Sequence, residues 1–175
     1  MKKLMLAVAA IATTVCAQAA TVKWTAANVY EMGSTATKAT GYLTYFVSSA
    51  DYTLAKATAD LAKEKVDFVS TYGVASAVTS GGLATQNITT TAGNSESWTG
   101  YLVIFNAESI DKATYAYITS EATKATGANG QQANLTFTSL TGTQTAGNWY
   151  AIPEPTSGLL MLLGFAGLAL RRRRA

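Results

Sequence analysis

The sequence contains no histidine, a single cysteine, Cys16, and two prolines, Pro153 and Pro155. Histidine is the most frequent general base, and histidine and cysteine supply most zinc ligands, so the commonest catalytic and metal sites cannot be assembled from this chain. A serine–lysine hydrolase or a carboxylate pair such as Glu108 and Asp111 would need neither residue, but no spacing singles out such a group. We therefore expect a protein that is not an enzyme and that holds no metal ion and no cofactor.

Arginine is absent before Arg171, and charged residues make up only 13% of the chain. The formal net charge is +3, but six of the 13 basic residues lie in the first three and the last five positions. The residues between these ends carry seven scattered lysines and nine acids before Glu154. Binding to nucleic acid depends on clustered basic side chains, so we expect no nucleic-acid partner.

The N-terminus has the pattern of a secretory signal peptide. Lys2 and Lys3 precede an apolar stretch over residues 4–15, and Ala17-Gln18-Ala19 supplies the small-residue pattern that signal peptidase recognises. The apolar stretch is shorter than the roughly 18 residues of a membrane span. Cys16 could indicate a lipoprotein, but the residues before it fit that motif poorly. We expect a signal peptide over residues 1–19, cleaved after Ala19 or Ala20.

The C-terminus carries a second targeting signal. Pro153-Glu154-Pro155 precede an apolar run from Leu159 to Leu170, and a block of four arginines follows the run: Arg171, Arg172, Arg173 and Arg174. The run is shorter than the roughly 20 residues of a comfortable transmembrane helix. A thin or transient crossing is expected, with the arginines retained on the cytoplasmic side.

These C-terminal residues resemble a PEP-CTERM protein-sorting domain, which covers residues 152–175 of this chain. The resemblance implies a bacterial exported protein that is a substrate of exosortase, a membrane sorting peptidase. It implies recognition at Pro153, Glu154 and Pro155, membrane insertion before processing, and delivery to the cell envelope, the cell surface or the extracellular matrix. The family is often associated with exopolysaccharide production.

The body between the two signals, residues 20–151, has the composition of one β-rich domain. It lacks cysteine, so no disulfide can support it, and its threonine, valine and tyrosine content is typical of pleated surfaces. We predict an antiparallel β-sandwich or barrel-like domain with one short helix. Strands are expected over 22–30, 42–48, 66–72, 83–91, 98–106, 113–119, 135–140 and 149–152, with the helix over 52–65, a turn over 92–96 and a loop over 127–132.

Trp24, Trp98 and Trp149 are open to two interpretations. They could form an exposed platform that stacks on sugar rings, or they could fill a core that no disulfide supports. The second interpretation is favoured. Taken together, the sequence predicts an exported surface or matrix protein with a structural or adhesive, non-catalytic role. The alternative is a carbohydrate-binding module for extracellular polysaccharide.

Overall fold

The computed structural model of the chain describes residues 21–89, 97–125, 132–138 and 140–152. The expected signal peptide, the turn over 92–96, most of the loop over 127–132 and the sorting tail from Pro153 onward lie outside these ranges. The described part is mainly β, as the sequence predicts. Its strands are β1 (Thr21–Ala26), β2 (Leu43–Ser48), β3 (Gly73–Ala77), β4 (Ala84–Thr89), β5 (Ser97–Phe105), β6 (Tyr115–Ile118), β7 (Ala122–Ala125), β8 (Ala133–Phe137) and β9 (Tyr150–Ala151), and its helices are α1 (Leu54–Leu61) and α2 (Asp67–Tyr72), with 3-10 turns η1 (Ile110–Lys112), η2 (Thr141–Gln144) and η3 (Ala146–Asn148).

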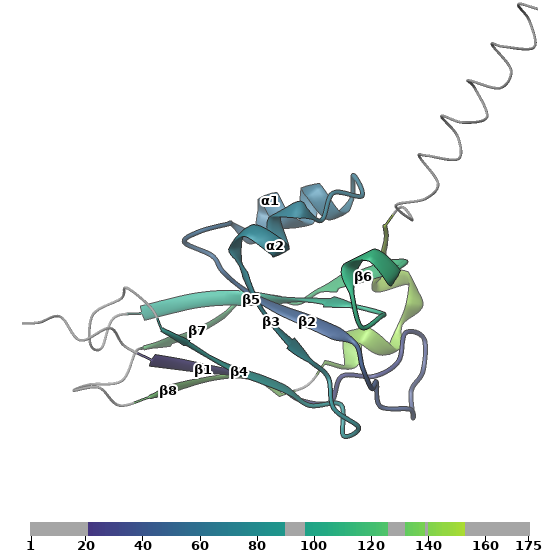
Figure 1. The fold of residues 1–175 in the computed structure, drawn as a ribbon, viewed down its shortest axis with the longest axis horizontal. Coiled ribbons are helices and arrows are strands. Elements are labelled where there is room, and N and C mark those ends of the chain that lie inside the picture. The colour runs from purple at the N-terminus through teal and green to yellow at the C-terminus, as the bar shows by residue number, and fades with distance from the viewer. Residues whose placement is uncertain (1–20, 90–96, 126–131, 139, 153–175) are drawn as a thin grey trace, which may run out of the picture.

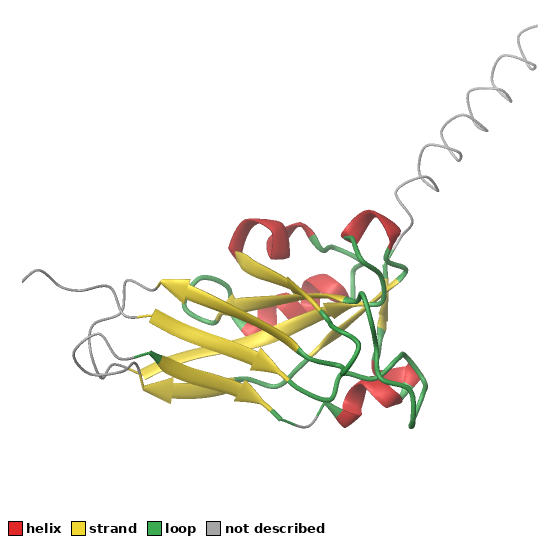
Figure 2. Ribbon diagram, turned by 60° about the horizontal axis from the view of Figure 1, so that its bottom comes forward, coloured by secondary structure: helices red, strands yellow, loops and turns green. Residues whose placement is uncertain are grey.

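The strands form two sheets. The larger sheet has the order β3-β2-β5-β6-β9, and β7 also pairs with β5. The smaller sheet has the order β4-β1-β8. Figure 1 shows the smaller sheet packed against the lower face of the larger sheet, and both α-helices lie on the upper face of the larger sheet. Figure 2 shows the same sheets and helices from another side. The domain is therefore a sandwich of two sheets with a third, helical layer.

Strand β5 lies at the centre of the fold because its residues are apolar on both faces. Leu102 and Ile104 point into the core between the two sheets. Tyr101, Val103 and Phe105 point into a second core beneath the helices. A strand covered on both faces reads as a continuous apolar run, and both β5 and its partner β2 have this character.

Helix α1 confirms the expected short helix, with narrower bounds than the predicted 52–65. Thr53 caps its N-terminus, since the Thr53 side chain accepts a hydrogen bond from the Lys56 amide at 3.4 Å. Ala57 and Leu61 are buried against the larger sheet. The helix ends in a turn in which Glu64 adopts a positive φ of 61°.

The strand predicted over 66–72 is wrong, because residues 67–72 form helix α2. Phe68 and Tyr72 both contact the ring of Tyr52, with ring centroids 4.7 and 5.2 Å away. A separation of four residues is compatible with both a strand and a helix face. Asp67 lies in the first turn, where a carboxylate favours a helix. The apolar pattern alone therefore could not distinguish the two structures.

Two features of the sheets do not follow from the sequence pattern. Strand β7 is short and lacks apolar alternation, and its pairing with β5 includes a 2.7 Å hydrogen bond between the hydroxyls of Thr99 and Thr123. Strand β1 pairs with β8 in parallel, so the smaller sheet is mixed rather than purely antiparallel. Among the described residues, none of the helices combines the length and the hydropathy of a membrane span.

Candidate functional site

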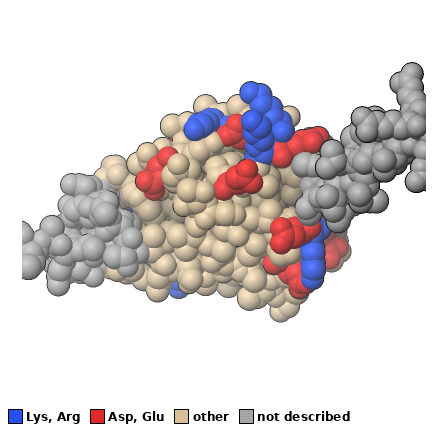
Figure 3. Space-filling model, turned by 45° about the horizontal axis from the view of Figure 1, so that its top comes forward, with Lys and Arg blue, Asp and Glu red and all other residues tan. Residues whose placement is uncertain are grey.

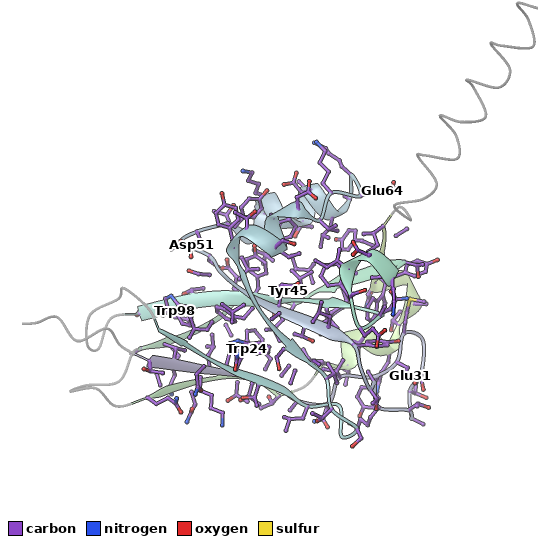
Figure 4. The ribbon with its side chains drawn as sticks, in the orientation of Figure 1. Trp24, Glu31, Tyr45, Asp51, Glu64 and Trp98 are labelled. Carbon is purple, nitrogen blue, oxygen red and sulfur yellow. The ribbon has the colours of Figure 1, made fainter. Side chains whose placement is uncertain are left out.

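The three tryptophans pack around the core between the sheets. Trp24 is fully buried and stacks on Phe46 with ring centroids 6.3 Å apart, and Trp98 stacks on the same ring at 4.9 Å. Trp149 is 7% exposed, and its indole nitrogen donates a 2.9 Å hydrogen bond to the carbonyl of Thr143. Figure 4 shows Trp24 between the sheets and Trp98 near the start of β5.

This burial removes Trp24 and Trp149 from any sugar-stacking surface, because neither ring faces solvent. Trp98 alone of the three is half-buried, and it packs against the edge of the same core. The shared aromatic platform considered from the sequence is therefore not assembled, and the core-filling interpretation describes Trp24 and Trp149.

The charged side chains form surface contacts. Within the described ranges, no group of three or more acidic, cysteine or histidine side chains could hold a metal ion. The Lys112 ammonium donates to the Glu108 carboxylate in an exposed ion pair, which lowers the pKa of Glu108 and raises the pKa of Lys112. Glu108 thus pairs with Lys112 rather than with Asp111. Figure 3 shows charged side chains gathered over the helical layer and the adjoining end of the body.

A tyrosine cluster attaches the helical layer to the larger sheet. The Tyr52 hydroxyl donates to the Asp60 carboxylate, and this hydrogen bond raises the pKa of Tyr52 to about 12. The Tyr101 hydroxyl donates to the Tyr52 carbonyl at 2.9 Å, and burial raises the pKa of Tyr101 as well. Both phenols stay protonated at neutral pH, so they act as hydrogen-bond donors that fix the helix on the sheet.

The outward face of the smaller sheet is polar and nearly uncharged. Its strand register places Thr25 between Thr85 and Thr136, and it places Lys23 between Asn87 and Asn134. We call these six residues the polar face. The four residues on the outer strands are exposed, and Lys23 and Thr25 on the central strand are half-buried. Lys23 is the single charged residue of the six.

Hydrogen bonds fix the side chains of Thr25, Thr85 and Asn87 on the polar face. The hydroxyls of Thr25 and Thr85 lie 3.2 Å apart, and the Thr85 hydroxyl is 2.9 Å from the Trp24 carbonyl. The Gln132 amide donates to the Asn87 side-chain oxygen at 3.1 Å. Neighbouring strands are about 4.8 Å apart and same-face residues are about 6.7 Å apart along a strand. The face therefore presents hydroxyl and amide groups at regular spacing.

The described chain ends at Ile152, which is held firmly in the body. Strand β9 pairs with β6, and Ala151 lies opposite Tyr115. The Ile152 amide donates a 2.9 Å hydrogen bond to the Thr114 carbonyl. The Ile152 side chain is 7% exposed and belongs to the core beneath the helices.

Two adjoining hollows, with volumes of about 390 and 290 Å³, lie between helix α2 and the 3-10 turn η1. Both are lined by Val66, Asp67, Ile110 and Asp111, and the second extends to Glu64, Lys65 and Ile152. We call these seven residues the junction groove. It has apolar side chains in its floor and exposed charged residues at its rim. No sequence pattern predicts the polar face or the junction groove, because each draws its residues from segments that are distant in the chain.

Comparison with known protein families identifies a PEP-CTERM protein-sorting motif at residues 151–174. No curated protein and no solved structure matches the chain. The motif indicates exosortase-dependent sorting of an exported, envelope-associated protein. The sequence-based recognition of this motif is thus confirmed. Its first two residues, Ala151 and Ile152, are the paired and buried residues that end the described body.

Proposed function

We propose that the chain is an exported cell-surface or extracellular-matrix protein whose body has a structural or adhesive role without catalysis. One observation carries the proposal: the sorting motif at residues 151–174 begins within the last strand of a β-sandwich. In this proposal the motif determines the destination, and the sandwich is the part that remains to act there. Signal peptidase and exosortase are the processing partners.

The test of sorting is a replacement of Pro153-Glu154-Pro155 by three alanines in the full chain. Cells that produce the wild type and the variant are fractionated, and the mass of the mature protein is measured in each fraction. We expect the variant to keep its tail and to fail to reach the surface fraction. Unchanged delivery together with an unchanged mass would contradict the sorting proposal.

A carbohydrate-binding role is the second candidate, and the polar face favours it. A neutral polysaccharide presents many hydroxyl groups and no charge, and the polar face offers hydroxyls and amides with one lysine. Because Trp24 and Trp149 are buried, binding would depend on hydrogen bonds rather than on a tryptophan platform. Extracellular polysaccharide from the producing cell is the proposed ligand.

The carbohydrate role is tested with Thr85→Lys/Thr136→Lys, which places two cations on the exposed outer strands of the polar face. Retention on immobilised neutral polysaccharide is measured for the mature wild type, for this variant and for a control variant, Thr35→Lys/Ser80→Lys. The control adds the same charge at exposed positions outside the polar face. Loss of retention in the first variant alone supports glycan binding. Equal retention in all three proteins contradicts it and leaves the structural role.

A further inference from the structure

The sorting motif begins inside the folded body. The motif match starts at Ala151, which is a paired residue of β9, and it continues through Ile152, whose amide is hydrogen-bonded to the Thr114 carbonyl. The Ile152 side chain is buried beneath the helical layer. No spacer therefore separates the domain from the residues that a sorting peptidase reads.

This connection brings the peptidase close to the body. Consecutive Cα atoms are about 3.8 Å apart, so a protein that grips Pro153 to Pro155 works within about 11 Å of the Ile152 Cα atom. A peptidase that encloses three residues of substrate is much wider than this distance. It must touch the surface that surrounds Ile152, unless β9 first separates from β6.

The junction groove is that surface. Val66, Ile110 and Ile152 supply its apolar floor, and the last of these residues is the point at which the described chain ends. Glu64, Asp67 and Asp111 at its rim are exposed, and Lys65 is the one opposing charge among the seven groove residues. The groove thus combines an apolar hollow with a net negative rim beside the motif.

We propose that the junction groove is a docking surface for the sorting peptidase, whose facing surface carries basic side chains. The inference rests on the proposed sorting function and adds a second recognition element to the tail. The groove adjoins the sorting motif, so the protein that occupies it is the peptidase that binds the motif. The negative rim of the groove calls for basic side chains on the facing surface of that peptidase. An anionic lipid surface would be repelled by the same rim, so the charge favours a protein partner over the membrane.

The test follows tail removal in cells by pulse labelling of the full chain. Glu64→Lys/Asp111→Lys reverses two exposed rim charges, and we expect a roughly five- to tenfold slower conversion to the mature mass because like charges now face each other. The matched control is Glu31→Lys/Asp51→Lys, which makes the same change at exposed positions away from Glu64 (Figure 4). The control should mature at the wild-type rate.

A variant with a spacer distinguishes a loss of docking from a general defect in folding or export. An insertion of six residues, Gly-Ser-Gly-Ser-Gly-Ser, between Ile152 and Pro153 moves the Pro-Glu-Pro residues away from the groove. With this insertion, chains that carry Glu64→Lys/Asp111→Lys and chains without these substitutions should mature at equal rates. The purified groove variant should also keep the wild-type thermal midpoint. A groove variant that matures as fast as the control overturns the proposal. Faster maturation than wild type also overturns it and points to an anionic lipid surface as the neighbour.

Two outcomes distinguish a failure of the sorting proposal from a failure of the docking proposal. If the alanine replacement of Pro153-Glu154-Pro155 leaves tail removal unchanged, sorting itself is wrong. If that replacement blocks tail removal and the groove variant does not slow it, sorting stands and the docking surface is wrong.

Discussion

The ring of Phe46 lies directly against the backbone of Gly100 on the neighbouring strand, where no side chain fits. A Cβ atom at Gly100 would lie 2.6 Å from Cε2 of Phe46 and 2.7 Å from the Val47 carbonyl oxygen. The same Phe46 ring stacks on Trp98 and Trp24. One glycine therefore allows the aromatic core to close over the centre of β5.

Gly100→Ala should lower the free energy of unfolding by about 1–3 kcal/mol, because the added methyl group overpacks the core. Chemical denaturation of the purified protein measures the change. Gly147→Ala is the matched control, since a Cβ at Gly147 meets nothing within 4 Å. Equal stabilities of the two variants would show that Phe46 can move away from Gly100 at little cost.

Two fully buried threonines should respond in opposite ways to the same substitution. The Thr44 hydroxyl has no hydrogen-bond partner among the described residues, whereas the Thr143 hydroxyl donates to the Leu140 carbonyl at 2.6 Å and accepts from the Tyr30 amide at 3.1 Å. Thr143→Val should cost about 1–3 kcal/mol, and Thr44→Val should be neutral or stabilising. Denaturant midpoints compare the two, and a large loss in Thr44→Val would reveal a buried partner such as water.

Stability should fall in alkaline solution through Tyr52. Its hydrogen bond to Asp60 raises the pKa from 10.0 to about 12 in the folded protein. A group with a raised folded pKa contributes stability that is complete below its unfolded pKa and is lost as the pH rises through the folded value. The loss should therefore occur between pH 10 and pH 12. Asp60→Asn and Tyr52→Phe should both flatten this part of the stability profile, and an unchanged slope in both variants would exclude Tyr52 as its source.

Acrylamide quenching should identify Trp98 as the accessible indole. Trp98 is half-buried, whereas Trp24 is 0% and Trp149 7% exposed. Trp98→Phe should therefore remove most of the quenchable fluorescence. Trp24→Phe should leave the quenchable part in place and lower the thermal midpoint, since Trp24 fills the core. Strong quenching that persists in Trp98→Phe would place another tryptophan at the surface.

Glu64→Gly should stabilise the body by up to about 1 kcal/mol, because glycine adopts a positive φ without the steric cost that other residues carry. Glu64 has a φ of 61° in the turn after α1. Lys63→Gly, at the preceding position without a positive φ, should instead destabilise the same turn. Thermal unfolding of both variants gives the comparison, and a loss of stability in Glu64→Gly would mean that the Glu64 side chain has an unrecognised contact.

The sequence predicted the elements that depend on local pattern. The apolar runs predicted the strands β2 and β5, and the helical spacing of apolar residues predicted helix α1. The cap at Thr53 was not predicted. The strand expected over residues 66–72 failed because Phe68 and Tyr72 are four residues apart, a spacing shared by both secondary structures.

The candidate surfaces depend on tertiary neighbours instead. Thr25, Thr85 and Thr136 form one row only after three strands from distant segments pair. Asp67 and Asp111 meet only when α2 packs near η1. The sorting motif was recognisable because it is contiguous, and the surfaces of the body are not.

Strand β1 has a consequence for when the chain can fold. It is the first described strand and the central strand of the smaller sheet, and its partners are β4 and β8. Its parallel partner spans residues 133–137, so a contact between distant parts of the chain must close before β1 is satisfied on both edges. Pairing of residues that are far apart in the sequence slows folding, because the chain between them must first be closed into a loop. The smaller sheet is therefore completed only after nearly all of the body has been synthesised.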